Sequence, residues 1–319
     1  MKFIITGALG HIGSRLVREL PLLLPDIDIV MIDDLSTQRY CSLFNLPTQK
    51  TTYSFIQGDL LKLDLKSIFA GTDVVIHLAA ITNATKSFDN QEQVEYVNYT
   101  TSLRVAETCV ATNAKMFLIS STSVYGTQKS QVDENCSSDE LNPQSPYAAT
   151  KLKEEVMVKQ KCLKEGLQGI ILRLGTIFGT SPGMRFHTAV NKFCWQAVMG
   201  TPLTVWETAY NQKRPYLDLV DAIRAIAFFV TSNQFNGRVY NVVTLNATVK
   251  EVVNSIQEFI PNLKIKFVTN KIMNQLSYEV LPAHLNEENF IFKGDLKQAL
   301  KDTISLLKQV SHESKILSF

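Results

Sequence analysis

The sequence predicts an α/β protein: a doubly wound parallel sheet, accompanied by a smaller C-terminal α/β region. Three observations favour this class. Strand-like and helix-like segments alternate through the first half of the chain. Several strand-like segments are continuously apolar, as expected for parallel strands covered by helices on both faces. A glycine-rich turn also joins the first strand to the first helix. Such alternation implies right-handed βαβ crossovers.

Short runs of apolar and β-branched residues mark the expected strands. In chain order they are residues 2–6, 28–33, 53–59, 73–80, 115–121 and 169–174. Amphipathic stretches at 94–112 and 147–166 are expected to be helices between them. A last helix at 295–309 places apolar residues on one face, which is typical of core packing.

The pattern changes after residue 173, where Gly, Pro and aromatic residues become frequent. Loop-rich segments of this kind commonly carry substrate contacts. We therefore expect residues 1–173 to form a dinucleotide-binding domain that also receives elements from about 214–245. Residues 174–319 are expected to form mainly a substrate-binding domain.

The first turn has the features of a pyrophosphate cradle. Gly7 permits a tight turn, Gly10 lets the backbone approach phosphates, and Gly13 lets the following helix pack closely on the strand. The helix N-terminus then offers N–H groups and a partial positive charge to an anion. The spacing is one residue wider than the usual dinucleotide fingerprint, and glycines also mark ordinary turns.

An acidic residue at the end of the second strand strengthens this interpretation. Asp33 lies 20 residues after Gly13, where a carboxylate accepts hydrogen bonds from the adenosine ribose. The same carboxylate repels a 2′-phosphate, so NAD is favoured over NADP. The alternative is that Asp33 or Asp34 only starts the next turn.

Composition limits the other functional classes. A net charge of +2 gives no electrostatic case for nucleic acid or an anionic membrane. The five cysteines show no paired spacing, which favours reduced thiols and a cytoplasmic protein. No apolar stretch approaches the roughly 20 residues of a membrane span. The five histidines show no metal-ligand spacing, so no metal is expected.

A catalytic constellation follows the fifth strand. Tyr147 and Lys151 share one face of a helix start, and a lysine there lowers the pKa of the phenol. A phenolate could then accept a proton from a substrate hydroxyl while hydride leaves to NAD. Ser121 lies where ligands bind at the carboxyl edge of the sheet and could bond the reacting oxygen. Arg214 suits bidentate phosphate binding. Taken singly, these residues also fit a surface pair, a serine-rich turn and a surface arginine.

The ordered set of motifs resembles a known family. TGALGHIG, MIDDLST, HLAA, SSTSVYG, YAATK, LRLGTIFG and RPYLDLVDA resemble the extended short-chain dehydrogenases/reductases of the nucleotide-sugar epimerase/dehydratase group, such as UDP-glucose 4-epimerase-like proteins. The resemblance covers nearly the whole chain and implies a Rossmann sheet and carbohydrate metabolism. It also implies a homodimer formed through the helices near 94–112 and 147–166.

The resemblance assigns roles to individual positions. Ser121, Tyr147 and Lys151 would be catalytic. Cofactor contacts would come from Gly7, Gly10, His11, Ile12, Gly13, Asp33, Asp34, Asp59, Leu60, Leu78, Ala79, Ala80, Asn98, Tyr147 and Lys151, and substrate contacts from Thr82, Ser121, Thr122, Thr176, Arg185 and Arg214.

Departures from the family pattern narrow the reaction. Dehydratases of this group carry an Asp-Glu pair where this chain has Thr122-Ser123. Without that acid/base pair, elimination of water is hard to catalyse. Many sugar epimerases have a substrate-contacting asparagine at the position of Thr176, so the contacts to the sugar are expected to differ from theirs. The missing Asp-Glu pair, in contrast, bears on the reaction itself. The sequence therefore favours an NAD-dependent epimerase, an isomerase acting at C4 of a nucleotide-activated sugar through a 4-keto intermediate.

Two other hypotheses stay open. The first is another NAD(P)-dependent oxidoreductase of the same family, namely a sugar reductase, a dehydrogenase, a dehydratase or an epimerase acting at another carbon. The second is a non-catalytic NAD-binding sensor or scaffold. The complete set of Ser121, Tyr147 and Lys151 argues against the second, because binding alone needs no general base.

Overall fold

The computed structural model describes residues 1–48, 51–82, 84, 86–126, 129–269 and 277–308. Its main feature is a seven-stranded sheet with the order β11-β7-β5-β4-β1-β2-β3, in which all paired neighbours are parallel. This confirms the predicted fold class. The strands are β1 (Lys2–Thr6), β2 (Asp28–Asp33), β3 (Thr52–Gln57), β4 (Val74–His77), β5 (Lys115–Ser121), β7 (Gly169–Leu174) and β11 (Val239–Val242).

Two of these strands are shorter than the sequence predicts. β3 ends at Gln57, because Asp59 starts a turn in which its carboxylate accepts the backbone N–H of Leu61. β4 ends at His77, and the three residues after it run past the sheet edge into a cavity wall. Their apolar character therefore reflects a ligand-facing segment as much as a strand.

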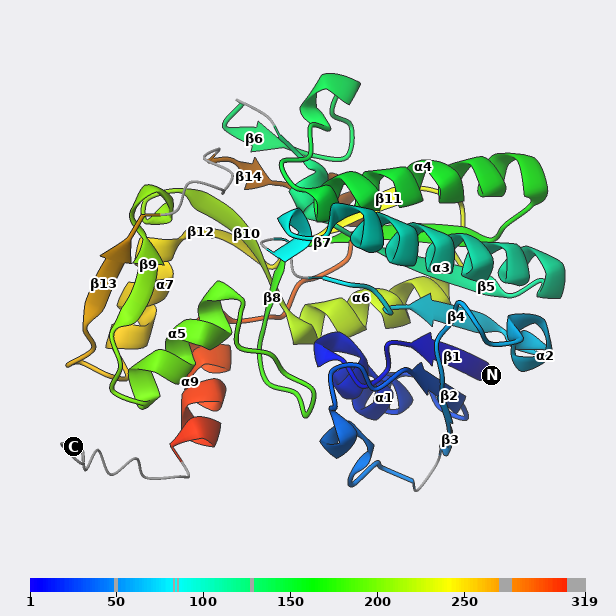
Figure 1. The fold of residues 1–319 in the computed structure, drawn as a ribbon, viewed down its shortest axis with the longest axis horizontal. Helices are drawn as coiled ribbons and strands as arrows, with labels where there is room; N and C mark the ends of the chain where they lie inside the picture. The colour runs from blue at the N-terminus through cyan, green and yellow to red at the C-terminus, as the bar shows by residue number, and fades with distance from the viewer. Residues whose placement is uncertain (49–50, 83, 85, 127–128, 270–276, 309–319) are drawn as a thin grey trace.

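Helices cover both faces of the sheet (Figure 1). On one face lie α1 (His11–Leu23) and α6 (Leu219–Ser232), which pack against each other over a core that includes Phe3 and Phe117. On the other lie α2 (Leu65–Phe69), α3 (Gln91–Thr112) and α4 (Pro146–Glu165), over a core that includes Ile4 and Leu118. Residues that alternate along β1 and β5 thus supply both cores.

The start of α4 is fixed by local chemistry. The Ser145 side chain accepts the backbone N–H of Ala148, and Pro146 occupies the first turn, where its missing N–H costs nothing. The helix ends at Gly166, whose φ of +74° is left-handed. These signals place Tyr147 in the first turn and Lys151 one turn later.

The remaining elements form a second group around a third core. The helix predicted at 295–309 is α9 (Leu296–Leu307), and its apolar face packs into this core. Residue 309 lies outside the described residues. The group contains β8 (Thr176–Phe178), β10 (Lys213–Asp218) and β12 (Leu245–Thr248) in one sheet, β9 (Leu203–Trp206) with β13 (Ile265–Val268), and α5 (Ala189–Val198), α7 (Val249–Gln257) and α9 (Leu296–Leu307). Two further elements, β6 (Gln131–Val132) and β14 (Glu279–Val280), pair in parallel, and α8 (Ala283–Glu287) packs on β11.

The sheet order positions a ligand site. β1 lies between β2 and β4, so the winding direction changes between β1 and β4. In open α/β sheets, ligands bind outside the carboxyl ends of the strands at such a switch point. Within the described part of the chain, no helix is long and apolar enough to cross a membrane.

Candidate active site

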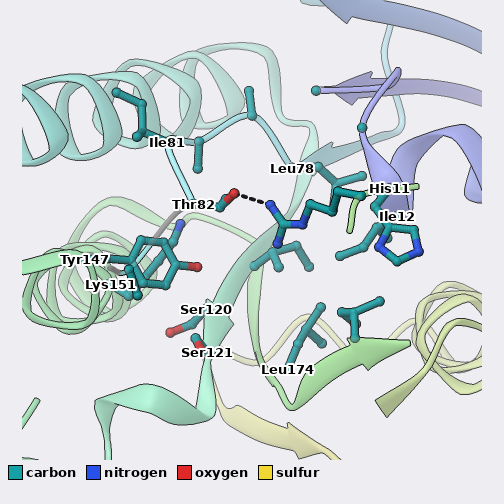
Figure 2. A pocket seen from close by; sticks show the side chains of 18 of the residues that line it. His11, Ile12, Leu78, Ile81, Thr82, Ser120, Ser121, Tyr147, Lys151 and Leu174 are labelled. Atoms are coloured by element: carbon teal, nitrogen blue, oxygen red, sulfur yellow. Dashed lines mark hydrogen bonds between the residues drawn. The ribbon is translucent and has the colours of Figure 1, made fainter. Parts of the chain in front are cut away.

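A cavity of about 880 Å³ opens at the carboxyl ends of the strands. Figure 2 shows side chains from the start of α1, the segment after β4, the ends of β5 and β7, and the start of α4 facing this common space. Every predicted site residue lines it except Asn98. The lining residues expected from the sequence are Gly7, Gly10, His11, Ile12, Gly13, Asp33, Asp34, Asp59, Leu60, Leu78, Ala79, Ala80, Thr82, Ser121, Thr122, Tyr147, Lys151, Thr176, Arg185 and Arg214.

The glycine turn fits a pyrophosphate. Gly7 has a φ of +64°, and a Cβ there would lie 2.7 Å from the backbone nitrogen of Ala79. A Cβ on Gly13 would lie 2.6 Å from the carbonyl oxygen of Gly7. Gly10 caps α1 with no side-chain hydrogen bond, and the first turn holds no acidic residue, so its N–H groups remain available to an anion. The backbone therefore forms the cradle that a dinucleotide requires.

Asp33 shapes this cradle and faces the same cavity. Its carboxylate accepts the backbone N–H of Leu9 at 3.1 Å and that of Leu35 at 3.0 Å. Burial raises the pKa of Asp33, while the two backbone donors and Arg39 oppose the rise. Asp33 thus ties the end of β2 to the glycine turn and leaves lone pairs for ribose hydroxyls.

Sequence reasoning missed several lining residues at this end. Ser36, Thr37 and Arg39 follow β2 and line the cavity. Their position in the turn directly after Asp33 and Asp34 could have identified them as lining residues. Arg39 places a guanidinium near Asp33, and burial lowers its pKa while Asp33 raises it.

The predicted catalytic residues lie together at the other end of the cavity. The Tyr147 hydroxyl points into the open space, and Ser121 lies at the nearby end of β5 (Figure 2). The Ser121 oxygen accepts from the backbone N–H of Ser123 at 3.2 Å and from its hydroxyl at 2.9 Å. Both acceptor positions are used, so the Ser121 proton is available to a substrate oxygen.

The proton affinity of Tyr147 differs from the sequence expectation. Burial raises the pKa of this phenol above its usual value. Lys151 and Arg185 pull the pKa down, as expected for nearby cations, and Glu154 pushes it up. Lys151 therefore acts on the phenol in the predicted direction, but desolvation is the larger effect, so the pKa is raised overall and not lowered.

Glu154, which the sequence analysis did not single out, forms a buried ion pair with Lys151. The Lys151 ammonium donates to the Glu154 carboxylate at 2.9 Å, and their side chains are 5% and 0% exposed. Lys151 lies 6.0 Å from the centroid of the Tyr147 ring. A spacing of three residues puts both charges on one helix face, which was the available signal.

The predicted substrate contacts surround the catalytic end. Arg185 donates to the Thr82 hydroxyl, and burial lowers the pKa of its guanidinium. The Thr122 hydroxyl donates to the carbonyl of Leu174 at 3.3 Å. Arg214 lies on β10 and donates to Gln212. Loops from both groups of elements thus meet across the cavity.

Asn98 takes a supporting position instead of a lining one. It is 1% exposed, and its amide accepts the Ile81 backbone N–H at 2.7 Å and donates to the Ile81 carbonyl at 2.9 Å. Since Ile81 lines the cavity, Asn98 fixes the backbone of a lining residue without lining the cavity itself. His11 also has a defined bond, to the Gly179 carbonyl, and burial lowers its pKa to about 4.

The distribution of carboxylates distinguishes the two ends. Among the described lining residues, the carboxylates are Asp33 at the end of β2, Asp34 directly after it, and Asp59 in the segment that follows β3. The residues after β5, where a dehydratase would need an acid/base pair, are Thr122 and Ser123.

Comparisons with known proteins identify relatives of this chain. Residues 3–242 match the model of the NAD dependent epimerase/dehydratase family. The chain is 31% identical over 315 residues to a protein named uncharacterized UDP-glucose epimerase YtcB of Bacillus subtilis, covering 96% of each. It is 25% identical to human dTDP-D-glucose 4,6-dehydratase, covering 98% of this chain and 92% of that protein.

A solved structure shares the whole fold. The UDP-glucuronic acid 4-epimerase from Bacillus cereus, in complex with NAD, superposes with a TM-score of 0.82 at 25% identity, covering 97% of this chain and 99% of that one. The family match and these relatives identify the chain as an enzyme whose cofactor is NAD. This chain therefore belongs to the NAD-dependent epimerase/dehydratase family.

Proposed function

We propose that the protein epimerises a nucleotide-activated sugar at C4, with NAD as a recycled cofactor. One observation carries the proposal. A single cavity joins a glycine cradle and Asp33 to Ser121, Tyr147 and Lys151, and among the described lining residues the carboxylates are Asp33, Asp34 and Asp59 at the glycine-turn end. This set can move a proton and support hydride transfer but lacks the acid/base pair for elimination.

Each catalytic residue has a defined task. Tyr147 accepts the proton of the C4 hydroxyl, and Ser121 donates a hydrogen bond to the reacting oxygen. Lys151 supplies positive charge beside the phenol and would contact the nicotinamide ribose. NAD, when bound, would supply the acceptor for the C4 hydride and the source from which hydride returns to the other face of the 4-keto sugar. Tyr147 then gives the proton back, so no net redox change occurs.

The proposed sites continue along the cavity. Gly7, Gly10 and Gly13 with the start of α1 hold the cofactor pyrophosphate, and Asp33 binds the adenosine ribose. Arg214 grips the substrate diphosphate from β10. The polar groups of Thr82, Thr122, Thr176 and Arg185 face the sugar.

The test is a substrate panel. The purified protein is incubated with UDP-glucose, UDP-N-acetylglucosamine and their 4-epimers, and with the corresponding dTDP-sugars. Conversion between 4-epimers without net NADH formation supports the proposal. Formation of a 4-keto-6-deoxy product would favour the dehydratase alternative, which the dehydratase relatives also suggest. Net NADH formation or consumption would favour a dehydrogenase or reductase.

The assembly and organisation of the chain are part of the proposal. α3 and α4 pack side by side on one face of the sheet (Figure 1). They expose the side chains of Tyr96, Val156 and Leu163 at 62%, 49% and 85%. Exposed apolar side chains on a helix pair suit a two-fold interface. We propose a cytoplasmic homodimer through these helices, with a division between cofactor and substrate domains near residue 173. Light scattering of Leu163→Glu, expected to be monomeric, tests the interface.

A further inference from the structure

A buried chain of hydrogen bonds reaches the catalytic lysine from the cofactor turn. The Ala79 backbone N–H donates to the Thr6 hydroxyl at 3.3 Å, and this hydroxyl lies 2.8 Å from His77 Nδ1. His77 Nε2 lies 3.1 Å from the Ser102 hydroxyl. Ser102 donates to Glu154 at 2.9 Å, at the same carboxylate oxygen that Lys151 contacts.

The direction of these bonds follows from proton counting. Ser102 has one hydroxyl proton and gives it to Glu154, so His77 Nε2 must donate to Ser102. His77 Nδ1 then accepts the proton of Thr6. Burial lowers the pKa of His77 to about 3, which fits this neutral tautomer. The chain of donors therefore ends on Oε2 of Glu154, which accepts from both Ser102 and Lys151. Burial raises the pKa of this carboxyl, and the two donors oppose the rise.

The neighbouring Glu155 differs from Glu154 in the cation that it contacts. Glu155 is also buried, but Arg173 meets it with two hydrogen bonds of 2.9 and 2.6 Å, and Ser120 donates a third. Its charge is thus neutralised by a dedicated arginine. The cation that Glu154 contacts is Lys151, a residue of the proposed catalytic set.

We propose that Glu154 is a positioning residue for catalysis: its carboxylate fixes the Lys151 ammonium beside Tyr147 and, by cancelling part of that positive charge, weakens the pull of Lys151 on the phenol proton. The proposal rests on the proposed roles of Tyr147 and Lys151. Tyr147 then holds a proton more firmly, so its phenolate is a stronger base toward the proton of the C4 hydroxyl.

Other charges near this pair are accounted for. On α4 itself, Glu155 faces Lys151 but is matched by Arg173 of β7. His77 of β4 is neutral, and Ser102 of α3 carries no charge. Arg185, from the segment before α5, lowers the pKa of Tyr147 together with Lys151. Glu154 is therefore the group whose removal changes the charge balance at the phenol most directly.

The experiment titrates Tyr147 in the whole protein by ¹³C NMR of ring-labelled tyrosine, with Tyr147→Phe identifying its signal. Glu154→Gln keeps an acceptor for Lys151 but removes the charge, so the Tyr147 midpoint should fall by about one pH unit. Ser102→Ala keeps the charge and should shift the midpoint much less. Glu165→Gln, which removes an exposed carboxylate on the same helix, should leave it unchanged.

An unchanged or raised midpoint in Glu154→Gln would overturn the proposal. Should that variant not fold, ¹³C NMR of labelled glutamate in the unaltered chain decides: Glu154 must be ionised at neutral pH, and a protonated carboxyl overturns the proposal. The acid limb of kcat against pH should also move to lower pH in Glu154→Gln. The titration needs no turnover, so it tests Glu154 even if every sugar in the panel fails.

Discussion

Replacing Asp33 by Asn tests how the protein selects its cofactor. The change keeps the side-chain volume and one carbonyl oxygen, which can retain one of the two bonds to Leu9 and Leu35. It removes the negative charge that would strengthen the hydrogen bonds donated by the ribose hydroxyls. A hydrogen bond to a charged group contributes about 1.5–3 kcal/mol, so NAD should bind roughly ten- to a hundredfold more weakly.

The same change should affect NADP differently. Asp33→Asn removes the repulsion of a 2′-phosphate and leaves Arg39, whose guanidinium lies near Asp33, without that counter-charge. NADP affinity should therefore stay constant or rise, and the ratio of NADP to NAD affinity should increase at least about tenfold.

Isothermal titration calorimetry with both cofactors measures this ratio, and thermal unfolding checks the fold. Asp28→Asn is the matched control, because it neutralises an exposed carboxylate at the other end of β2 and should leave both affinities unchanged. If Asp33→Asn weakens NADP as much as NAD, the assigned role of Asp33 is wrong.

Further predictions concern catalysis and stability. Tyr147→Phe should lower kcat by about 10²–10⁴-fold while NAD affinity and thermal stability stay near wild type; a steady-state assay beside calorimetry checks both. Gly13→Ala should abolish NAD binding in calorimetry, because its Cβ would lie 2.6 Å from the Gly7 carbonyl oxygen; unaltered affinity would contradict the cradle. Arg173→Met leaves the 1%-exposed Glu155 carboxylate without its cation and should lower the free energy of unfolding by about 3–5 kcal/mol in urea titrations. Burial lowers the pKa of His77 from a usual 6.5 to about 3, so between those pH values the unfolded chain binds a proton that the folded chain does not. The free energy of unfolding should therefore fall as the pH drops through that range. His77→Asn should reduce this dependence of the free energy of unfolding on pH.

Local signals explain why much of the fold could be predicted from the sequence. The continuously apolar strands and the glycine turn specify a covered parallel sheet, and Ser145, Pro146 and Gly166 delimit α4. This topology places Ser121, at the end of β5, and Tyr147, at the start of α4, at the same carboxyl edge of the sheet. The predicted strand continues beyond Gln57, but Asp59 starts a turn there. It also continues beyond His77, because the apolar residues that line the cavity look like strand residues.

The remaining features depend on tertiary contacts. The sequence KLKEE suggests a solvated helix face, yet Glu154 and Glu155 are buried, because β7 brings Arg173 and α3 brings Ser102 against them. Desolvation is also the largest effect on the pKa of Tyr147, and no sequence spacing reveals the desolvation of a residue in a cavity wall.

The central claim is that hydride leaves C4 of a nucleotide sugar and returns to the same carbon. Its most direct test is epimerisation of a UDP-sugar deuterated at C4, followed by NMR and mass spectrometry of both epimers. The account predicts interconversion with deuterium retained at C4 and no accumulation of NADH. Loss of the label to solvent, or an unchanged substrate across the whole panel, would contradict it.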